Sequence, residues 1–270
     1  MNNVFYIHSD FTKYCKLLKI KESIKKFKSY EEFTQNALIS MYNDIEQIFG
    51  SNYILPTYNY DFSKMKTFHL KQDQGHTGIF SEFCRLKKLF FRSHIPIFSS
   101  ISKNNNNLKF INKNCKLNPF DKKSDLGILH KNKGFLINFG SNFSPTFIHY
   151  IENNLGTKLL YRYKKSFFGK LYLDKNIFHK VELNFNVRPL SLNLKYDLKK
   201  IKKDLLIEGL LKNKFFEKKL NYQMINSSDF YEFSMLKLEK DPYYLIDYNS
   251  KKLLKKEKLW YKKIKYKDFE

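Results

Sequence analysis

The segment from Gly134 to Glu152 constrains the fold of this chain more than any other. Residues 136–139 form a short apolar run between two glycines, as expected for a buried strand. Ser144 is a favourable N-cap residue, and Pro145 suits the first helical position, where its missing N–H is not needed. The sequence therefore predicts a buried strand, a glycine turn and a helix in direct succession.

The predicted helix carries Thr146, His149 and Glu152 at intervals of three residues. Residues three apart lie side by side on a helix, so these side chains should converge near the carboxyl end of the strand, where open α/β sheets bind ligands. There a neutral imidazole can accept a proton, a carboxylate can orient the ring, and a threonine hydroxyl can stabilise an oxyanion. Alternatively, His149 is an ordinary half-buried helix residue and Glu152 is its solvated neighbour.

The order of apolar patterns predicts a layered α/β domain, because strands alternate with helices in the first half of the chain. The expected strands are 4–7, 53–55, 97–101, 108–111 and 136–139, and the expected helices are 30–49 and 79–89. Beyond Glu152 we expect strands at 159–164, 169–173 and 179–188, and helices at 195–211 and 230–239. A chain of 270 residues can bury one large core, so we expect one domain over residues 1–248. Residues 249–270 form a basic segment, expected to be a solvated terminal helix or tail.

Cysteine usage and hydropathy predict a cytoplasmic protein. The three cysteines are widely spaced and lack a CxxC pair, which argues against disulfides and against a zinc site. No apolar stretch approaches the roughly 20 residues needed to cross a bilayer. The chain opens on a strand-like run instead of a signal peptide.

The formal net charge of +24 is compatible with a nucleic-acid partner. The excess charge is spread from Lys13 to Lys267, and most of it is lysine accompanied by Asn, Ile, Phe and Tyr, a mixture typical of coding DNA rich in A and T. Helix-turn-helix, RNP-type and zinc-finger patterns are absent from the sequence. A basic nucleic-acid-binding module therefore stays an alternative, and nucleic acid is not the expected partner. The charge should attract a nucleotide-bearing substrate and repel a polycation.

Short strings along almost the whole chain follow the order of a known family. They are Val4 to Ser9, Leu55 to Phe62, Gly78 to Arg85, Arg92 to Ser99, Asn118 to Phe120, Ser124 to Gly127, Thr146 to Glu152, Tyr161 to Lys165 and Asp241 to Leu245. Together they resemble the aminoglycoside 3-N-acetyltransferase family, which transfers an acetyl group from acetyl-CoA to an amine and is distinct from the GNAT acetyltransferases.

This resemblance implies a three-layer α/β/α sandwich with a central mixed sheet, folded as a single domain with a CoA-binding cleft. It implies that His149 is the catalytic histidine and that Thr146 lies near the acetyl carbonyl. Glu152 and Glu82 match acidic positions close to the reacting amine. Glu82 could equally be a structural partner of a nearby arginine.

The resemblance also assigns CoA binding to the turn formed by His8, Ser9 and Asp10. Thr57 and Tyr58 would line the same cleft. Alternatively, the turn is an ordinary strand end that caps a helix, and Tyr58 is a core residue or a residue at the rim of the cleft.

Three features depart from the family pattern. The chain starts at the first strand, where the family has a preceding helix. Ile95 and Pro96 stand where the family usually has His-Pro. A lysine-rich helix over residues 13–28 stands where the family usually has a glycine-rich segment after the first strand. A catalytically inactive relative of the transferase is therefore a second alternative.

The leading interpretation is an acetyl-CoA-dependent N-acetyltransferase, monomeric or homodimeric, with His149 as general base and no metal. The acceptor is an aminoglycoside-like or, preferably, a nucleotide-linked amino sugar. The preference follows from the positive charge and from the resemblance, because family members with similar Tyr-Arg-Tyr-Lys and Asp-Pro-Tyr-Tyr-Leu strings occur in surface-polysaccharide pathways. Antibiotic resistance is the less favoured role.

Overall fold

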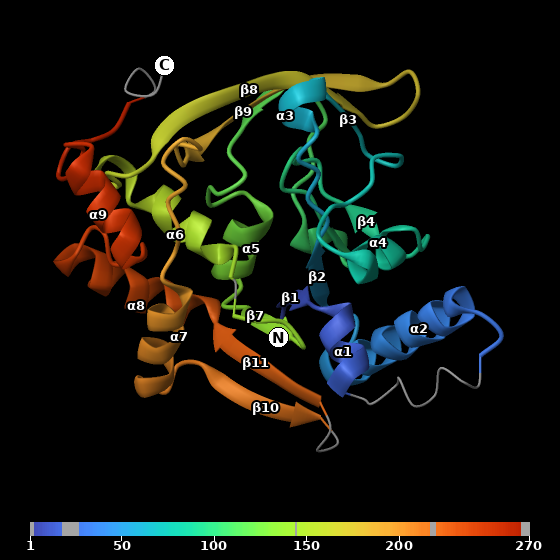
Figure 1. Ribbon diagram of the computed structural model, residues 1–270. Helices are drawn as coiled ribbons and strands as arrows, with labels where there is room; N and C mark the ends of the chain where they lie inside the picture. Colours follow the sequence, from blue (N-terminus) through green and yellow to red (C-terminus); the bar gives the residue numbers. More distant parts are fainter. Residues whose placement is uncertain (1–2, 18–26, 144, 217–219, 266–270) are drawn as a thin grey trace.

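The computed structural model describes residues 3–17, 27–143, 145–216 and 220–265 (Figure 1). The strands are β1 (Phe5–Ser9), β2 (Tyr53–Pro56), β3 (Thr67–His69), β4 (Phe91–Arg92), β5 (Ser100–Ser102), β6 (Cys115–Leu117), β7 (Phe135–Phe139), β8 (Tyr163–Tyr172), β9 (Phe178–Val187), β10 (Lys212–Phe216) and β11 (Leu220–Asn226). The α-helices are α1 (Phe11–Leu17), α2 (Tyr30–Phe49), α3 (Phe62–Met65), α4 (Ile79–Arg85), α5 (Asp125–Lys131), α6 (Phe147–Asn154), α7 (Leu198–Ile207), α8 (Ser227–Lys240) and α9 (Tyr248–Lys256). Two 3₁₀ turns, η2 (Asn105–Asn107) and η3 (Gly156–Lys158), complete the described elements.

The main sheet has seven strands in the order β10-β11-β7-β1-β2-β5-β4. Strand β1 is parallel to both of its neighbours, β2 and β7. Strand β11 pairs antiparallel with β7, and β5 pairs antiparallel with β2. The predicted central mixed sheet is therefore confirmed, with β1 and β7 at its centre.

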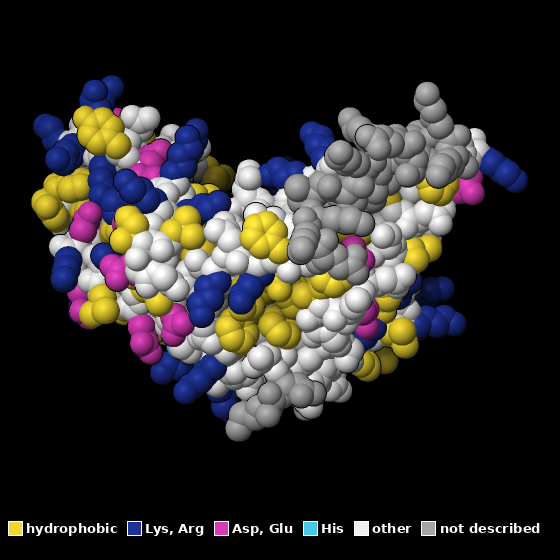
Figure 2. All heavy atoms as spheres, turned by 90° about the horizontal axis from the view of Figure 1, so that it is seen from below, with side chains coloured by type: hydrophobic (Ala, Val, Ile, Leu, Met, Phe, Trp, Pro, Cys, Tyr) yellow, Lys and Arg dark blue, Asp and Glu magenta, His cyan; other side chains and the backbone are white. Residues whose placement is uncertain are grey.

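Two neighbouring residues of β1 show how helices cover both faces of this sheet. Because successive side chains of a strand point to opposite faces, Tyr6 and Ile7 enter different cores. Tyr6 belongs to the cluster that contains Phe147 of α6. Ile7 belongs to the cluster that contains Met41 and Ile45 of α2. The three-layer α/β/α sandwich is thus confirmed, with α5, α6 and α8 on one side and α1 and α2 on the other (Figure 1). Seen from below, a strip of hydrophobic side chains crosses the middle of the molecule (Figure 2).

A smaller, four-stranded sheet has the order β3-β8-β9-β6 and arches over the top of the molecule in Figure 1. Its long hairpin pairs β8 with β9 over ten residues of each strand, from Tyr163 opposite Val187 to Tyr172 opposite Phe178. The residue before β8 is Arg162, whose Nη1 donates to the backbone oxygen of Asn186 at 3.1 Å. This hairpin therefore fixes the place of Arg162 relative to α6.

Helix α2 is the most accurately predicted element, since it covers the expected residues 30–49. The Ser29 side chain accepts a hydrogen bond from the backbone N–H of Glu32, which caps the first turn. Gly50 ends the helix with φ 67°, a backbone conformation that favours glycine.

Several other predicted elements need correction. The helix expected at 79–89 ends at Arg85, and the strand expected at 97–101 is reduced to β5. Residues 108–111 form no strand, and the two strands expected at 159–164 and 169–173 are one strand, β8.

The hairpin of β10 and β11 lies where the pattern predicts no strand. Strand β10 is an edge strand, exposed over residues 212–215, so it lacks the apolar face that would reveal it.

The basic terminal segment, expected to be solvated, packs onto the domain in its described part. Leu254 of α9 is fully buried and Ile264 is 1 % exposed. The Trp260 ring stacks on Tyr243 with ring centroids 4.0 Å apart. The lysine-rich helix expected over residues 13–28 lies partly outside the described residues, which show α1 up to Leu17. None of the helices in the described parts of the chain is long and apolar enough to span a membrane.

Candidate active site

Helix α6 follows β7 closely, and Thr146 is its N-cap residue. The predicted N-cap, Ser144, lies outside the described residues, and the helix starts at Phe147, slightly later than expected. His149 and Glu152 share one face of the helix, because the Nδ1 atom of His149 lies 3.3 Å from Oε2 of Glu152. The predicted succession of strand, glycine turn and helix is confirmed.

Glu152 is only 1 % exposed, which excludes the alternative of a solvated neighbour. The Tyr161 hydroxyl donates to its Oε1 at 2.9 Å, and the Tyr196 hydroxyl donates to its Oε2 at 2.6 Å. Arg162 forms an ion pair with the same carboxylate, with Nε 2.8 Å from Oε2. Burial alone would raise the pKa of Glu152, but the Arg162 charge and the hydrogen bonds from His149 and Tyr196 outweigh it and lower the pKa to about 2. The carboxylate is therefore ionised at neutral pH.

The His149 ring is fixed through one of its two nitrogens. Nδ1 lies 3.0 Å from Arg162 Nη2 and 3.0 Å from the Tyr196 hydroxyl, in addition to its contact with Glu152. The Phe120 ring packs against it with centroids 5.2 Å apart. The side chain is still 22 % exposed, so the ring does not point into closed hydrocarbon packing. When Nδ1 donates to Glu152, the neutral ring has its lone pair on Nε2, which is then the nitrogen that can accept a proton.

The surroundings of His149 favour the neutral ring. Burial is the largest influence and lowers its pKa; the positive charges of Arg162 and Arg188 lower it further, and Glu152 opposes them. An imidazole whose pKa is lowered from its ordinary value of about 6.5 is deprotonated at neutral pH and can accept a proton.

Thr146 joins a chain of buried polar groups beneath the helix. Its side chain lies close enough to the hydroxyl of Tyr58 to influence that group's pKa. The Tyr58 hydroxyl lies 2.7 Å from that of Tyr6, and Tyr6 is 3.4 Å from Oγ of Ser100. Ser100 in turn lies near Asp125, a buried carboxyl whose pKa is raised to about 7 by desolvation and whose Oδ2 has no hydrogen-bond partner among the described residues. The sequence did not single out this chain beyond Thr146 and Tyr58.

Thr57 is fully buried in the packing between β2 and β5. Its Oγ1 donates to the carbonyl oxygen of Ser99 at 3.2 Å. Its own carbonyl oxygen accepts from Arg92 Nη2 at 2.8 Å and from Ser99 Oγ at 2.7 Å. Of the two residues expected to line a CoA cleft after β2, Tyr58 is the one in contact with the α6 terminus.

The turn of His8, Ser9 and Asp10 ends β1 and starts α1. Asp10 accepts the backbone N–H of Lys13 at 2.9 Å, which is the helix-capping role left open by the sequence. The His8 carbonyl oxygen accepts from Oγ of Ser141 at 3.0 Å, which ties this turn to the loop between β7 and α6. The turn expected to bind CoA and the helix of His149 therefore belong to one region at the carboxyl edge of the sheet.

Glu82 lies in a separate cluster on α4. Arg85 holds both of its carboxylate oxygens, with Nε 2.7 Å from Oε2 and Nη2 2.5 Å from Oε1. The backbone N–H of Gly75 also donates to Oε2 at 3.0 Å. Burial would raise the pKa of Glu82, but the bonds from Arg85 and Gly75 outweigh it and lower the pKa.

Sequence reasoning missed Arg162 and Tyr196 as partners of His149. One available signal is composition, because only four of the 50 Lys and Arg residues are arginine: Arg85, Arg92, Arg162 and Arg188. Where lysine supplies nearly all positive charge, an arginine marks a site that needs the planar, bidentate guanidinium. Tyr196 is one of 19 tyrosines, so composition does not single it out.

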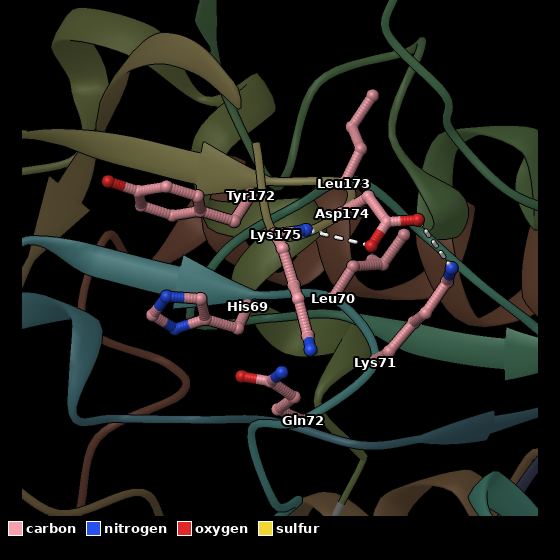
Figure 3. Close-up of a pocket in the computed structure, with 8 residues that line it drawn as sticks. All are labelled: His69, Leu70, Lys71, Gln72, Tyr172, Leu173, Asp174 and Lys175. Carbon is pink, nitrogen blue, oxygen red and sulfur yellow. Dashed lines mark hydrogen bonds and ion pairs between the residues drawn. The ribbon is translucent and has the colours of Figure 1, made fainter. Parts of the chain in front are cut away.

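A pocket of about 180 Å³ at the ends of β3 and β8 is a separate feature (Figure 3). His69 and Tyr172 stack across it with ring centroids 4.6 Å apart, and Lys71 pairs with Asp174 at 3.1 Å. None of its lining residues belongs to the His149 cluster. In the described parts of the chain, no three His, Cys, Asp or Glu residues are grouped so as to hold a metal ion.

Comparison with known proteins establishes the fold. No family model matches the chain, and no curated protein matches it. Among solved structures, aminoglycoside acetyltransferase AAC(3)-IIb is 12 % identical, with coverage of 89 % of this chain and 91 % of that chain and a TM-score of 0.64. AAC-IIIb in a binary complex with CoASH is 13 % identical, with coverage of 88 % and 90 % and a TM-score of 0.61. The YokD protein from Bacillus subtilis is 11 % identical, with coverage of 89 % of each chain and a TM-score of 0.60. The chain thus has the α/β fold found in aminoglycoside 3-N-acetyltransferase structures.

Proposed function

We propose that this protein is an N-acetyltransferase that moves the acetyl group of acetyl-CoA to an amino group of a sugar, with His149 as general base. The observation that carries this proposal is the partly exposed, neutral His149 ring, anchored at Nδ1 by the buried Glu152 and the half-buried Tyr196. The fold supports it, because its solved neighbours include aminoglycoside acetyltransferases, one of them with CoASH.

In the proposed reaction, acetyl-CoA supplies an activated thioester carbonyl, and the acceptor amine must lose a proton as it attacks. Nε2 of His149 takes this proton, directly or through one water. The C–N bond forms, the C–S bond breaks, and the departing thiolate recovers the proton from the imidazolium. Between these two proton transfers, Glu152 stabilises the positively charged His149 ring. The positive charge of Arg162 keeps the pKa of the ring low, so that the imidazolium can release the proton. A positioned general base contributes about 10²- to 10⁴-fold in rate.

Thr146 is the proposed partner of the developing oxyanion. It stands at the N-terminus of α6, where the helix dipole favours negative charge. The interaction of its side chain with the Tyr58 hydroxyl orients Thr146 before the substrate binds. For Glu82 we propose the structural role among the two that the sequence allows, because Arg85 and Gly75 occupy both of its oxygens.

A nucleotide-linked amino sugar is the proposed acceptor. The charge of Glu152 is balanced by Arg162, and Arg188 lies close enough to affect His149, so the surroundings of the ring carry a net positive charge. The whole chain has a formal net charge of +24. Both features repel an aminoglycoside polycation and attract a diphosphate-linked sugar.

The test is a thiol-release assay with acetyl-CoA and two acceptor panels, nucleotide-linked amino sugars and aminoglycosides. We expect acetyl-CoA to raise the melting temperature and the nucleotide-linked panel to give the higher kcat/KM. Absence of both thiol release and stabilisation would indicate an inactive relative. Salt-sensitive oligonucleotide binding without any response to CoA would indicate a nucleic-acid-binding module.

A further inference from the structure

A basic pocket of about 360 Å³ lies where the end of β7 meets α1, β11 and α7. Lys13, Lys16 and Lys202 line it. The other lining residues carry amides, a hydroxyl or no side chain: Asn138, Gly140, Ser141, Asn142, Asn221 and Gln223. As the structure describes this pocket, its lining combines three ammonium groups with neutral hydrogen-bonding groups and contains no carboxylate.

Among the described residues, carboxylates do not neutralise the charges of all three lysines of this pocket. Lys13 Nζ donates to Oδ1 of Asn142 at 2.6 Å and has a longer contact, 3.8 Å, with Asp10. Lys16 and Lys202 form no ion pair with a carboxylate in the parts of the chain that the structure describes. Three ammonium groups brought together at this point repel one another, and an anion between them removes that repulsion.

Strand register connects the pocket with the centre of the sheet. Gln223 of β11 lies opposite Asn138 of β7, and Asn138 lies opposite His8 of β1. Side chains of directly paired residues share one face of a sheet, so these three form a polar row. Tyr6, two residues before His8, faces the same way and contacts Tyr58, which interacts with Thr146. The buried polar row and the start of α6 therefore lie on the same face of the sheet.

His8 lies at one end of this polar row. Its Nε2 is buried and has no hydrogen-bond partner among the described residues. Buried polar atoms in proteins are nearly always hydrogen-bonded, so such an atom beside a basic pocket is an independent indication of a ligand.

We propose that the pocket of Lys13, Lys16 and Lys202 binds a phosphate or diphosphate group of a substrate of the proposed reaction. Ammonium and amide groups are suitable donors for phosphate oxygens, and charge-assisted hydrogen bonds are the stronger kind. This inference rests on the proposed function. Two substrates of that reaction carry the required chemistry, the diphosphate of CoA and the diphosphate of a nucleotide-linked amino sugar.

The experiment compares two double variants with equal loss of charge. Lys16→Gln with Lys202→Gln removes two ammonium groups of the pocket. The control, Lys199→Gln with Lys203→Gln, removes two exposed ammonium groups from the same α7 helix outside the pocket lining. We expect the first variant to raise the KM of the phosphate-bearing substrate about tenfold or more with little change in kcat. The control should change KM less than about threefold.

Truncated substrates identify the source of the phosphate. If CoA is held there, the KM of acetyl-CoA rises in the pocket variant and that of acetyl-pantetheine, which lacks the diphosphate, does not. If the sugar nucleotide is held there, its KM rises and that of the free amino sugar does not. Equal effects of the pocket and control variants would overturn the inference and leave the proposed function intact.

A wild-type protein without any turnover would contradict the proposed function instead. Titration calorimetry with CoA and with a nucleoside diphosphate then tests the pocket alone. Weaker binding of either ligand by the pocket variant than by the control supports the pocket, and equal or absent binding refutes it.

Discussion

Arg162 and Glu152 form a buried ion pair beneath His149, with Nε 2.8 Å from Oε2 and both residues almost fully buried. A buried pair is costly to break, since removal of one partner leaves the other charge uncompensated in a medium of low polarity. The pair therefore fixes Glu152 as a carboxylate, and with it the electrostatic environment of the ring above.

The Arg162→Met variant tests this pair through stability. We expect it to lower the free energy of unfolding by about 3 to 5 kcal/mol, measured by urea denaturation. The double variant Arg162→Met with Glu152→Gln should recover part of that loss, because no buried charge stays unpaired. The control is Lys200→Met, which removes the exposed pair with Asp204 and should cost less than about 1 kcal/mol. A loss for Arg162→Met no larger than for the control would contradict a buried charged pair.

Acidification should destabilise the protein through His8, whose pKa is lowered by burial to about 4. In the unfolded state the ring has a pKa of about 6.5, so between these values the unfolded chain binds a proton that the folded protein does not. Stability is therefore complete above the unfolded pKa and falls as the pH drops toward the folded one. The His8 contribution to this fall is about 2 kcal/mol between pH 7 and pH 5.

The measurement compares the pH slope of unfolding between the wild type and His8→Asn. The slope should become shallower in His8→Asn. An unchanged slope in His8→Asn would show that folding does not shift the pKa of His8.

Tyr58→Phe removes the hydroxyl between Tyr6 and Thr146. A buried hydrogen bond contributes about 1 kcal/mol to stability, which should be the loss on thermal unfolding. Because Thr146 also loses its orienting partner, we expect a several-fold lower kcat with an unchanged KM for acetyl-CoA. Tyr60→Phe is the matched control, since Tyr60 is 51 % exposed. Wild-type kcat in Tyr58→Phe would mean that the hydroxyl chain does not serve the reaction.

Glu82→Gln distinguishes the two roles that the sequence allows for this residue. If Glu82 anchors Arg85, the variant should lose about 1 to 3 kcal/mol of stability and keep its kcat. Glu239→Gln, at an exposed position of α8, controls for the change in charge. A kcat loss of a hundredfold at wild-type stability would instead place Glu82 at the reacting amine.

The sequence was informative where local chemistry decides the structure. Ser29 and Gly50 mark the ends of α2, and the glycine turn after β7 leads into α6, because caps and turns depend on a few adjacent residues. The spacing of His149 and Glu152 sufficed to bring them together, since a helix fixes that geometry by itself.

The rest of the site depends on contacts between distant segments. Tyr196, 44 positions further along the chain, hydrogen-bonds Glu152, and the pairing of β8 with β9 positions Arg162. No local pattern encodes such contacts. The exposed edge strand β10 was missed for a related reason, because it has no buried face to give an alternating pattern.

The central claim is tested most directly by kcat of His149→Gln with acetyl-CoA and the best acceptor, measured from pH 5 to pH 9. The variant should fold like the wild type by circular dichroism and lose about 10²- to 10⁴-fold in kcat. The wild-type rate should fall only below the ordinary histidine pKa of about 6.5, since burial and Arg162 lower the pKa of this ring, and the variant should lack that limb. A folded His149→Gln protein with near wild-type kcat and the same pH profile would contradict the account.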